Sequence, residues 1–271
     1  KLRVELGFRV EELKTDNFTF YLDFDGVIAD SAQECIKTSF DAWLKYNKEI
    51  LEMNIKKDFE SFRDLVTENA LKYRFLVTPP EHYYCLIDFI AQEILSTKIE
   101  LTNKSAQKKF TRSTQTVSPK LLEKFKVDFF LTRKDRLEKY GKSNWLLENP
   151  PTKFLEKFLN LIKQINSEII IISRKDRNSI SLWLDEKKIN VSQIFCNEKI
   201  SQYDNSKFNL IEHLQSQKNY KKGIFIDDSA EEIISKDWKS ISITPILAGW
   251  GYNLKKDNSE SVLNQIQTEI L

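Results

Sequence analysis

Residues 20–31 read FYLDFDGVIADS, and this stretch decides the fold that we expect for the whole chain. An apolar run ends at Leu22, and Asp23 and Asp25 follow it two positions apart, directly before Gly26. Two residues at that spacing point to the same side of an extended chain, so their carboxylates would be crowded together. Burying such charges is costly unless they are paired or bound to a metal. A cation at the end of a buried strand would relieve this crowding.

Apolar runs of the same kind recur in the second half of the chain, each followed by polar residues. Such runs are typical of strands that are covered on both faces, as in a parallel sheet. Helical patterns alternate with them, and this order of elements indicates a Rossmann-like, doubly wound α/β core. The expected strands are FTFYL (18–22), EIIII (168–172), SQIF (192–195, the weakest), GIFI (223–226) and ISITPILAG (241–249). The expected helices of this core are at 151–165, 178–188 and 207–217.

The alternation is interrupted between the first two expected strands. Residues 32–149 show aromatic-rich amphipathic helical patterns and no strand-like alternation of any length. The Pro-Pro pair at 79–80 and the polar stretch TNKSAQKKFTRSTQTVSP (102–119) divide this segment into pieces. We therefore expect a discontinuous α/β core, residues 1–31 and 150–271, with a mostly α-helical cap domain, residues 32–149, inserted into it.

The residue totals exclude several classes of protein and of site. With 271 residues, 41% apolar and 30% charged, the chain is typical of a globular protein, and a net charge of +2 gives no general reason to expect nucleic acid or membrane as partner. No apolar run approaches the length that crosses a bilayer. Two histidines and three widely spaced cysteines exclude a multi-histidine metal centre, a disulfide scaffold and a thiolate zinc site. Because the chain begins without an apolar signal core, we expect a cytoplasmic protein.

Polar side chains follow the expected strands at the points where the strands end. The carboxyl ends of parallel strands meet at one edge of a sheet, so these side chains should line a common pocket. They provide two to four acids, one hydroxyl and one ammonium group, without a histidine or a cysteine. The residues are Asp23 and Asp25, Ser173, Lys207 at the start of the helix after 192–195, and Asp227, Asp228 and Ser229, with Glu232 four residues beyond Asp228.

This set of groups fits phosphoryl transfer assisted by Mg²⁺. Mg²⁺ prefers hard oxygen ligands and is typically held by one or two carboxylates together with a phosphate. One aspartate can attack phosphorus, and the other, two residues on, can protonate the leaving oxygen and then activate water. The serine and the lysine can hold the phosphoryl oxygens, since positioning and charge stabilisation dominate this chemistry. Gly26 would let the backbone turn sharply beside the site.

Four ordered motifs resemble those of phosphatases of the haloacid dehalogenase superfamily. The helical segment directly after the first motif is similar to the helical type-1 cap of that family. The segment ILAGWGYN at 246–253 also looks like the tail of phosphoglycolate-phosphatase-like members. The matching motifs are DFDGV at 23–27, Ser173, Lys207 and DDSAEE at 227–232.

The resemblance implies a catalytic or metal-binding role for four aspartates. Asp23 would be the nucleophile, and Asp25 would be the general acid and base. Asp23, the backbone carbonyl of Asp25, and Asp228 would hold Mg²⁺, with Asp227 reaching the ion through water.

The resemblance also implies a phosphate-binding set and a reaction. Ser173, Arg174 and Lys207 would bind the phosphoryl group, with Lys199 as a second candidate for the lysine. The implied reaction is Mg²⁺-dependent hydrolysis of a small phosphomonoester, either a sugar phosphate or a phosphoglycolate-like ester, through an aspartyl-phosphate. The expected partner is a small phosphorylated metabolite.

Three other functions stay open on the sequence alone. A phosphomutase would use the same four motifs, and a non-catalytic binding or accessory module could keep the core for its structure only. A nucleic acid end-processing phosphatase is indicated only by residues 98–142, which hold 13 Lys and Arg against 5 Asp and Glu. We expect this basic stretch to be a solvated helical face with a mobile loop. Trp250 and Tyr252 are expected to pack rather than to contact substrate.

Overall fold

The computed structural model describes residues 18–48, 59–96, 101–163, 165, 167–219, 221–234, 236–253 and 257–270. The start of the chain, where no signal core is expected, and residues 98–100 of the basic stretch lie outside the described residues. Within the described ranges, no helix is both long enough and apolar enough to cross a membrane.

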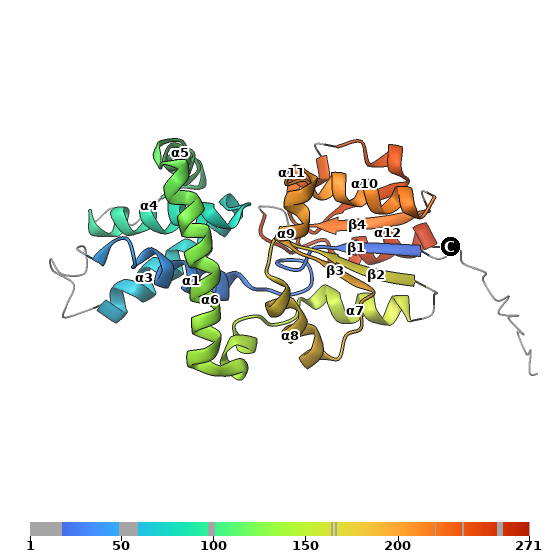
Figure 1. Cartoon of the computed structure of the whole chain (residues 1–271), viewed down its shortest axis with the longest axis horizontal. Coiled ribbons are helices and arrows are strands. Elements are labelled where there is room, and N and C mark those ends of the chain that lie inside the picture. Colours follow the sequence, from blue (N-terminus) through green and yellow to red (C-terminus); the bar gives the residue numbers. More distant parts are fainter. Residues whose placement is uncertain are drawn as a thin grey trace, which may run out of the picture.

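Five parallel strands form one sheet in the order β3-β2-β1-β4-β5 (Figure 1). β1 is central, because Phe20 pairs with Ile169 of β2 on one side and with Ile224 of β4 on the other. Each strand overlaps one of the apolar runs in which it was expected. The strands are β1 (Phe18–Leu22), β2 (Ser167–Ile172), β3 (Gln193–Phe195), β4 (Gly223–Asp227) and β5 (Ile243–Leu247).

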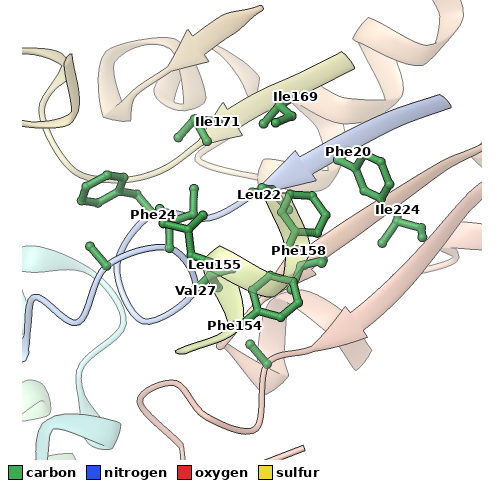
Figure 2. Close-up of a cluster of buried hydrophobic side chains, with 14 of the residues drawn as sticks. Phe20, Leu22, Phe24, Val27, Phe154, Leu155, Phe158, Ile169, Ile171 and Ile224 are labelled. Carbon is green, nitrogen blue, oxygen red and sulfur yellow. The ribbon is translucent and has the colours of Figure 1, made fainter. Parts of the chain in front are cut away.

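Helices cover both faces of this sheet, as expected for a doubly wound α/β fold. Phe20 and Leu22 of β1 point into a hydrophobic cluster on one face, whereas Tyr21 points into a second cluster on the other. Figure 2 shows Phe154 and Phe158 packed against the strand side chains of the first face. The first face is covered by α7 (Lys153–Ile162), α8 (Arg177–Lys187) and α12 (Ser259–Ile270), and the second by α10 (Lys207–Gln217) and the 3₁₀ helix η4 (Trp238–Ile241). Short helices α9 (Asn197–Ile200), η3 (Ser201–Tyr203) and α11 (Ala230–Ile234) lie in the connections.

The strand order reverses at β1. β2 and β3 lie on one side of β1, and β4 and β5 lie on the other. In open α/β sheets, ligands bind in the crevice outside the carboxyl ends of the strands at such a point. The two strands that end there in this protein are β1, at Leu22, and β4, at Asp227.

Residues 32–149, the helical insertion, have a hydrophobic cluster of their own beside the sheet (Figure 1). Phe40 and Phe125 are fully buried in it. The end of the insertion differs, because Trp145 belongs to the cluster under the sheet. The expected domain boundaries, 1–31 with 150–271 and 32–149, therefore stay a prediction. The helices of the insertion are α1 (Ala32–Trp43), α3 (Phe59–Lys72), η1 (Arg74–Leu76), η2 (Pro80–His82), α4 (Tyr83–Leu95), α5 (Asn103–Thr116) and α6 (Pro119–Leu147).

The prediction that the polar stretch 102–119 breaks the insertion is wrong for most of its length, because most of it forms helix α5. The Thr102 side chain accepts a hydrogen bond from the Ser105 N–H and so caps this helix. Ala106 and Phe110, four residues apart on one face, are buried in the cluster of the insertion. A helix that buries so narrow a face needs few apolar residues, and its composition therefore resembles that of a loop.

Replacing Phe125 by Ala is expected to destabilise the protein by about 3–5 kcal/mol, because the change removes a fully buried ring and leaves a cavity. The Phe125 ring packs edge-on against Tyr84, with the ring centroids 5.5 Å apart. Val127 lies on the same helix and is 54% exposed, so Val127→Ala should change the free energy of unfolding by less than about 0.5 kcal/mol. Urea denaturation measures both changes. Equal stabilities of the two variants would contradict a separate hydrophobic core in the insertion.

Candidate active site

Three carboxylates meet at the carboxyl ends of β1 and β4. Asp23 directly follows β1, Asp227 is the last residue of β4, and Asp228 comes next. One oxygen from each lies within 4.8 Å of the others, and all three side chains are largely buried. Strand pairing brings them together, since the Asp23 N–H donates to the Ile226 carbonyl at 2.9 Å. We call Asp23, Asp227 and Asp228 the carboxylate cluster.

Lys207 supplies a positive charge to this cluster. It is the first residue of α10, and the Ser206 hydroxyl caps that helix by accepting from the Asn209 N–H. The buried Lys207 Nζ lies 2.7 Å from Asp227 Oδ2 and 3.2 Å from Asp23 Oδ1. The alternative lysine, Lys199, lies elsewhere, because its Nζ donates to Gln202 on the surface at 3.0 Å.

The carboxylate cluster holds more negative charge than one ammonium group offsets. Burial, together with the charge of Asp23 and against the opposing charge of Lys207, raises the pKa of Asp227 to about 8 and the pKa of Asp228 to about 6. A divalent cation would stabilise the three carboxylates together. The cluster offers only hard oxygen donors, without histidine or cysteine, and this donor set fits Mg²⁺.

The Asp25 carboxylate has partners of its own and is not part of the carboxylate cluster. Its Oδ1 accepts a hydrogen bond from the Ser31 hydroxyl and lies 3.2 Å from Lys175 Nζ. The backbone turns at Gly26, which has a φ of +80° and whose N–H donates to the Ala29 carbonyl at 2.8 Å. The carboxylates that crowd Asp23 are therefore those of Asp227 and Asp228, at the end of β4, and not the carboxylate of Asp25.

Ser173 and Arg174 follow β2 and line the same crevice. Ser173 is buried, and its N–H donates to the Phe195 carbonyl at 3.0 Å. The Arg174 guanidinium donates to Glu232 Oε1 at 2.8 Å and to the Asn205 carbonyl at 2.9 Å. Glu232, which is the last acid of the fourth motif, thus orients an arginine.

One cavity of about 670 Å³, the main cavity, brings together all seven residues that the sequence predicted for the site. It is lined on the sheet side by Asp23, Asp25, Ser173, Arg174, Lys207, Asp227 and Asp228. The helical insertion lines the opposite side with residues 74–78 and Gln107. The cavity therefore lies between the edge of the sheet and the insertion.

No protein-family model and no curated protein sequence matches this chain. Solved structures do resemble it. A predicted phosphatase from Clostridium acetobutylicum has a TM-score of 0.52 at 15% identity, over 93% of this chain and 99% of that one. The chain has the haloacid dehalogenase-like fold. A haloacid dehalogenase-like hydrolase from Streptococcus pneumoniae has a TM-score of 0.51 at 12% identity, over 93% and 99% of the two chains.

A candidate phosphoglycolate phosphatase from Lactobacillus delbrueckii subsp. bulgaricus has a TM-score of 0.55 at 12% identity, over 94% of this chain and 99% of that one. These shares of the chain include the helical insertion as well as the sheet. The haloacid dehalogenase-like fold that the four motifs implied is therefore confirmed. At 12–15% identity, this likeness concerns the fold alone.

Sequence reasoning missed a set of buried charges behind Asp25. Lys175 Nζ lies 2.9 Å from Glu34 Oε2, and Arg133 Nε lies 2.8 Å from Glu34 Oε1. Arg133 Nη1 also lies 3.2 Å from Asp176 Oδ2. Although burial opposes its charge, the two cations hold the pKa of Glu34 well below its ordinary value. Lys175 could have been found from its place two residues after Ser173, whereas Glu34 and Arg133 lie in helical patterns without any signature.

The expectation that Trp250 and Tyr252 pack rather than contact substrate is confirmed for the packing of Trp250 and stays a prediction for Tyr252. Trp250 stacks on Phe154 with ring centroids 4.4 Å apart, so it packs as expected. Tyr252 lines the main cavity, and its backbone N–H donates to Asp228 Oδ2 at 2.6 Å. It therefore helps to orient one member of the carboxylate cluster.

The raised pKa values predict that the metal-free protein becomes less stable as the pH rises from about 5 to about 8. The carboxyls of Asp227 and Asp228 titrate near 8 and 6 in the folded state and near 3.8 ordinarily, so the folded state binds more protons over this range. Raising the pH removes those protons and leaves repelling carboxylates. Urea unfolding in EDTA across this range measures the effect.

Asp228→Asn should flatten that pH dependence, because it removes one of the titrating groups. Asp185, an exposed residue of α8, offers a matched control, and Asp185→Asn should leave the pH dependence as it is. A stability of the unsubstituted protein that rises with pH between about 5 and 8 would contradict the prediction.

Proposed function

We propose that this protein is a Mg²⁺-dependent phosphatase that hydrolyses a small phosphomonoester through an aspartyl-phosphate on Asp23. The observation that carries the proposal is the buried carboxylate cluster beside Lys207, with the Asp25 carboxylate at the same cavity. The likeness to phosphatases and hydrolases of the haloacid dehalogenase-like fold supports it. Hydrolysis of a phosphate ester needs these three parts, namely a nucleophile, an acid and positive charge around the phosphoryl group.

Asp23, Asp228 and the backbone carbonyl of Asp25 would hold Mg²⁺. Asp227 has both of its oxygens engaged, one by the Ser229 N–H at 2.8 Å and the other by Lys207 at 2.7 Å. An indirect role for Asp227, through water, agrees with these partners. When bound, Mg²⁺ offsets the charge of the carboxylate cluster and polarises the phosphoryl oxygens.

Asp23 is held in a fixed orientation for attack on phosphorus. Its Oδ1 accepts from the Phe24 N–H at 2.7 Å and lies 3.2 Å from Lys207 Nζ. In the first step, an Asp23 oxygen forms a bond to phosphorus while the bond from phosphorus to the alcohol oxygen breaks. Ser173, Arg174 and Lys207 would bind the transferring oxygens from the same cavity.

Asp25 would move the proton in both steps. Protonated, it gives its proton to the departing alcohol oxygen; as a carboxylate, it then takes a proton from the water that attacks the aspartyl-phosphate. That second step breaks the Asp23–phosphorus bond, releases phosphate and restores Asp23. Ser31 and Lys175 hold the Asp25 carboxylate at the cavity for this purpose.

The helical insertion would act as a cap over the site. Residues 74–78 and Gln107 line the side of the main cavity opposite the sheet edge. A cavity of about 670 Å³ that is lined from both sides fits a small phosphorylated metabolite better than a polymer. Exclusion of water by such a cap favours attack by the one water that Asp25 activates.

Asp23→Asn is expected to reduce phosphate release by about 10⁴-fold or more, because the nucleophile is lost. Asp25→Asn should behave differently with dinitrophenyl phosphate, whose leaving group needs no proton. That variant should release one equivalent of dinitrophenolate per protein and then stop, since the phosphorylated Asp23 is not hydrolysed. Rapid-mixing absorbance measures the dinitrophenolate that is released, and mass spectrometry of the intact protein detects the phosphorylated Asp23.

The matched control for both variants is Asp185→Asn, which should keep full turnover because Asp185 lies exposed on α8. EDTA should abolish turnover in every variant that has it. Turnover by Asp23→Asn at the level of the control would contradict the assigned nucleophile. Turnover that persists in EDTA would contradict the metal requirement.

Gly26→Ala is expected to weaken Mg²⁺ binding by about tenfold or more. A Cβ on Gly26 would lie 2.5 Å from Asp228 Oδ2 and displace that carboxylate. Gly141 is a matched control, because its φ of +79° is nearly the same as the +80° of Gly26 but nothing lies within 4 Å of a Cβ there. Both variants should lose stability because a positive φ disfavours a residue with a Cβ, and at Gly141, where φ is 79° and ψ is 161°, the cost is about 1–3 kcal/mol. Calorimetric titration with Mg²⁺ separates them, and equal affinities would contradict the placement of Asp228 at the ion.

A further inference from the structure

The Asp25 carboxylate is held at one of its two oxygens. In the residues that the structure describes, the Ser31 hydroxyl and Lys175 Nζ both contact Oδ1, Lys175 at 3.2 Å, and no hydrogen bond or ion pair engages Oδ2. The residue also lines the main cavity, with 18% of its side chain exposed. Oδ2 is therefore the oxygen left to carry the proton in the two steps proposed for Asp25.

Lys175 is shared between Asp25 and a second carboxylate, that of Glu34. Its Nζ lies 2.9 Å from Glu34 Oε2, which is closer than the 3.2 Å that separate it from Asp25 Oδ1. Glu34 is fully buried, so its charge has to be balanced by other groups of the chain. A Glu34 carboxylate without another cation would compete with Asp25 for Lys175.

Arg133 of α6 is the cation that limits this competition. Its Nε lies 2.8 Å from Glu34 Oε1, and its Nη1 lies 3.2 Å from Asp176 Oδ2. The guanidinium also lies over the Phe129 ring, 4.5 Å from the centroid. Helix α1, which carries Glu34, packs beside α6 (Figure 1). One oxygen of Glu34 is thus held from within the insertion, and the other is left for Lys175 of the core.

Stability alone is a weak explanation for these buried charges. Replacing a buried ion pair by well-packed apolar side chains of similar volume is often neutral or stabilising. Arg133, Glu34 and Lys175 are all buried, and their contacts end on Asp25, the proposed acid and base. This connection indicates that they serve to place its carboxylate.

We propose that Arg133 is a positioning residue for Asp25 and acts through Glu34 and Lys175. This assignment rests on the phosphatase function proposed above. Without Arg133, Lys175 would move toward the uncompensated carboxylate of Glu34 and release Asp25 from its orientation. Asp23 would keep its own contacts with the Phe24 N–H and with Lys207. Loss of Arg133 should therefore impair proton transfer and spare the attack on phosphorus.

Dinitrophenyl phosphate separates these two effects within one substrate. Its first turnover needs attack by Asp23 and no proton, whereas every later turnover needs Asp25 to activate water. Arg133→Met should release the first equivalent of dinitrophenolate at a rate within about threefold of that of the unsubstituted protein. Its later turnover should be about 10²-fold slower, because a small displacement of a catalytic group has an effect of this size. Arg133→Lys, which keeps the charge, should recover part of the later rate. Rapid-mixing absorbance measures both phases.

Arg136→Met is the matched control. Arg136 lies one turn further along α6, is also buried, and pairs with Asp41 and Glu148. In the described part of the chain, none of these three residues has a printed-out ion pair or hydrogen bond to Asp25 or to the residues that hold it. Arg136→Met should lose stability through its unpaired carboxylates and keep both rates within about threefold.

Equal losses in the two phases of Arg133→Met would overturn the proposal, because Arg133 would then act on the phosphoryl group or on the fold as a whole. Later turnover as fast as that of Arg136→Met would overturn it too. Lys175→Met tests the route of the effect. That variant should slow later turnover at least as much, and adding Arg133→Met to it should change the rate by less than about threefold. A further loss of about 10²-fold in the double variant would contradict an action through Lys175.

Where Arg133→Met does not fold, Arg133→Lys carries the same test. Its later turnover should fall by at least about threefold more than its first turnover, and equal losses would overturn the proposal. Failure of the proposed function itself has a different signature. The unsubstituted protein would then release no dinitrophenolate, either in the first turnover or later.

Discussion

The parallel pairing of β1 with β4 is the constraint on which the rest of this protein depends. It places Asp23 beside Asp227 and Asp228 in a buried crevice, where one oxygen from each lies within 4.8 Å of the others. Desolvation makes such an arrangement unfavourable unless positive charge balances it. Lys207, at the start of α10, supplies one such charge. A local arrangement that opposes folding is expected at a functional site, and a cation bound there would remove the conflict.

The helical insertion adds a second buried set of charges behind the first. Arg133 of α6 joins Glu34 of α1 to Asp176 at the start of α8, and Glu34 also pairs with Lys175, which holds Asp25. The position of the proposed acid and base is therefore set by contacts between the insertion and the core. The proposed proton transfer by Asp25 therefore depends on the insertion, because the insertion contributes Glu34 and Arg133 to the contacts that position Asp25.

The five strands, the core helices α7, α8 and α10, and the position of the seven expected residues at one cavity could be predicted because each depends on local pattern. Apolar runs mark β1 and β4, and a polar residue at the end of a parallel strand has to lie at the common edge of the sheet. The same reasoning failed for 102–119, where polar composition hid a helix that buries only Ala106 and Phe110. It did not indicate that Tyr252 lines the main cavity and donates to Asp228, because packing and site contacts look alike in a sequence.

The sequence by itself determined the order of strands and helices and the placing of Asp23 and Asp227 at strand ends, since hydrophobic periodicity and strand-end position are properties of neighbouring residues. Only the tertiary structure decided which charges meet. Glu34 and Arg133 are 99 positions apart, and their contact depends on how α1 and α6 pack. The same holds for Arg74 of the insertion and Tyr252 of the core, since the position of the guanidinium, 4.4 Å from the ring centroid, depends on how the insertion packs against the sheet. A single sequence carries no signal for such contacts, because they are set by the angles and registers at which distant helices pack.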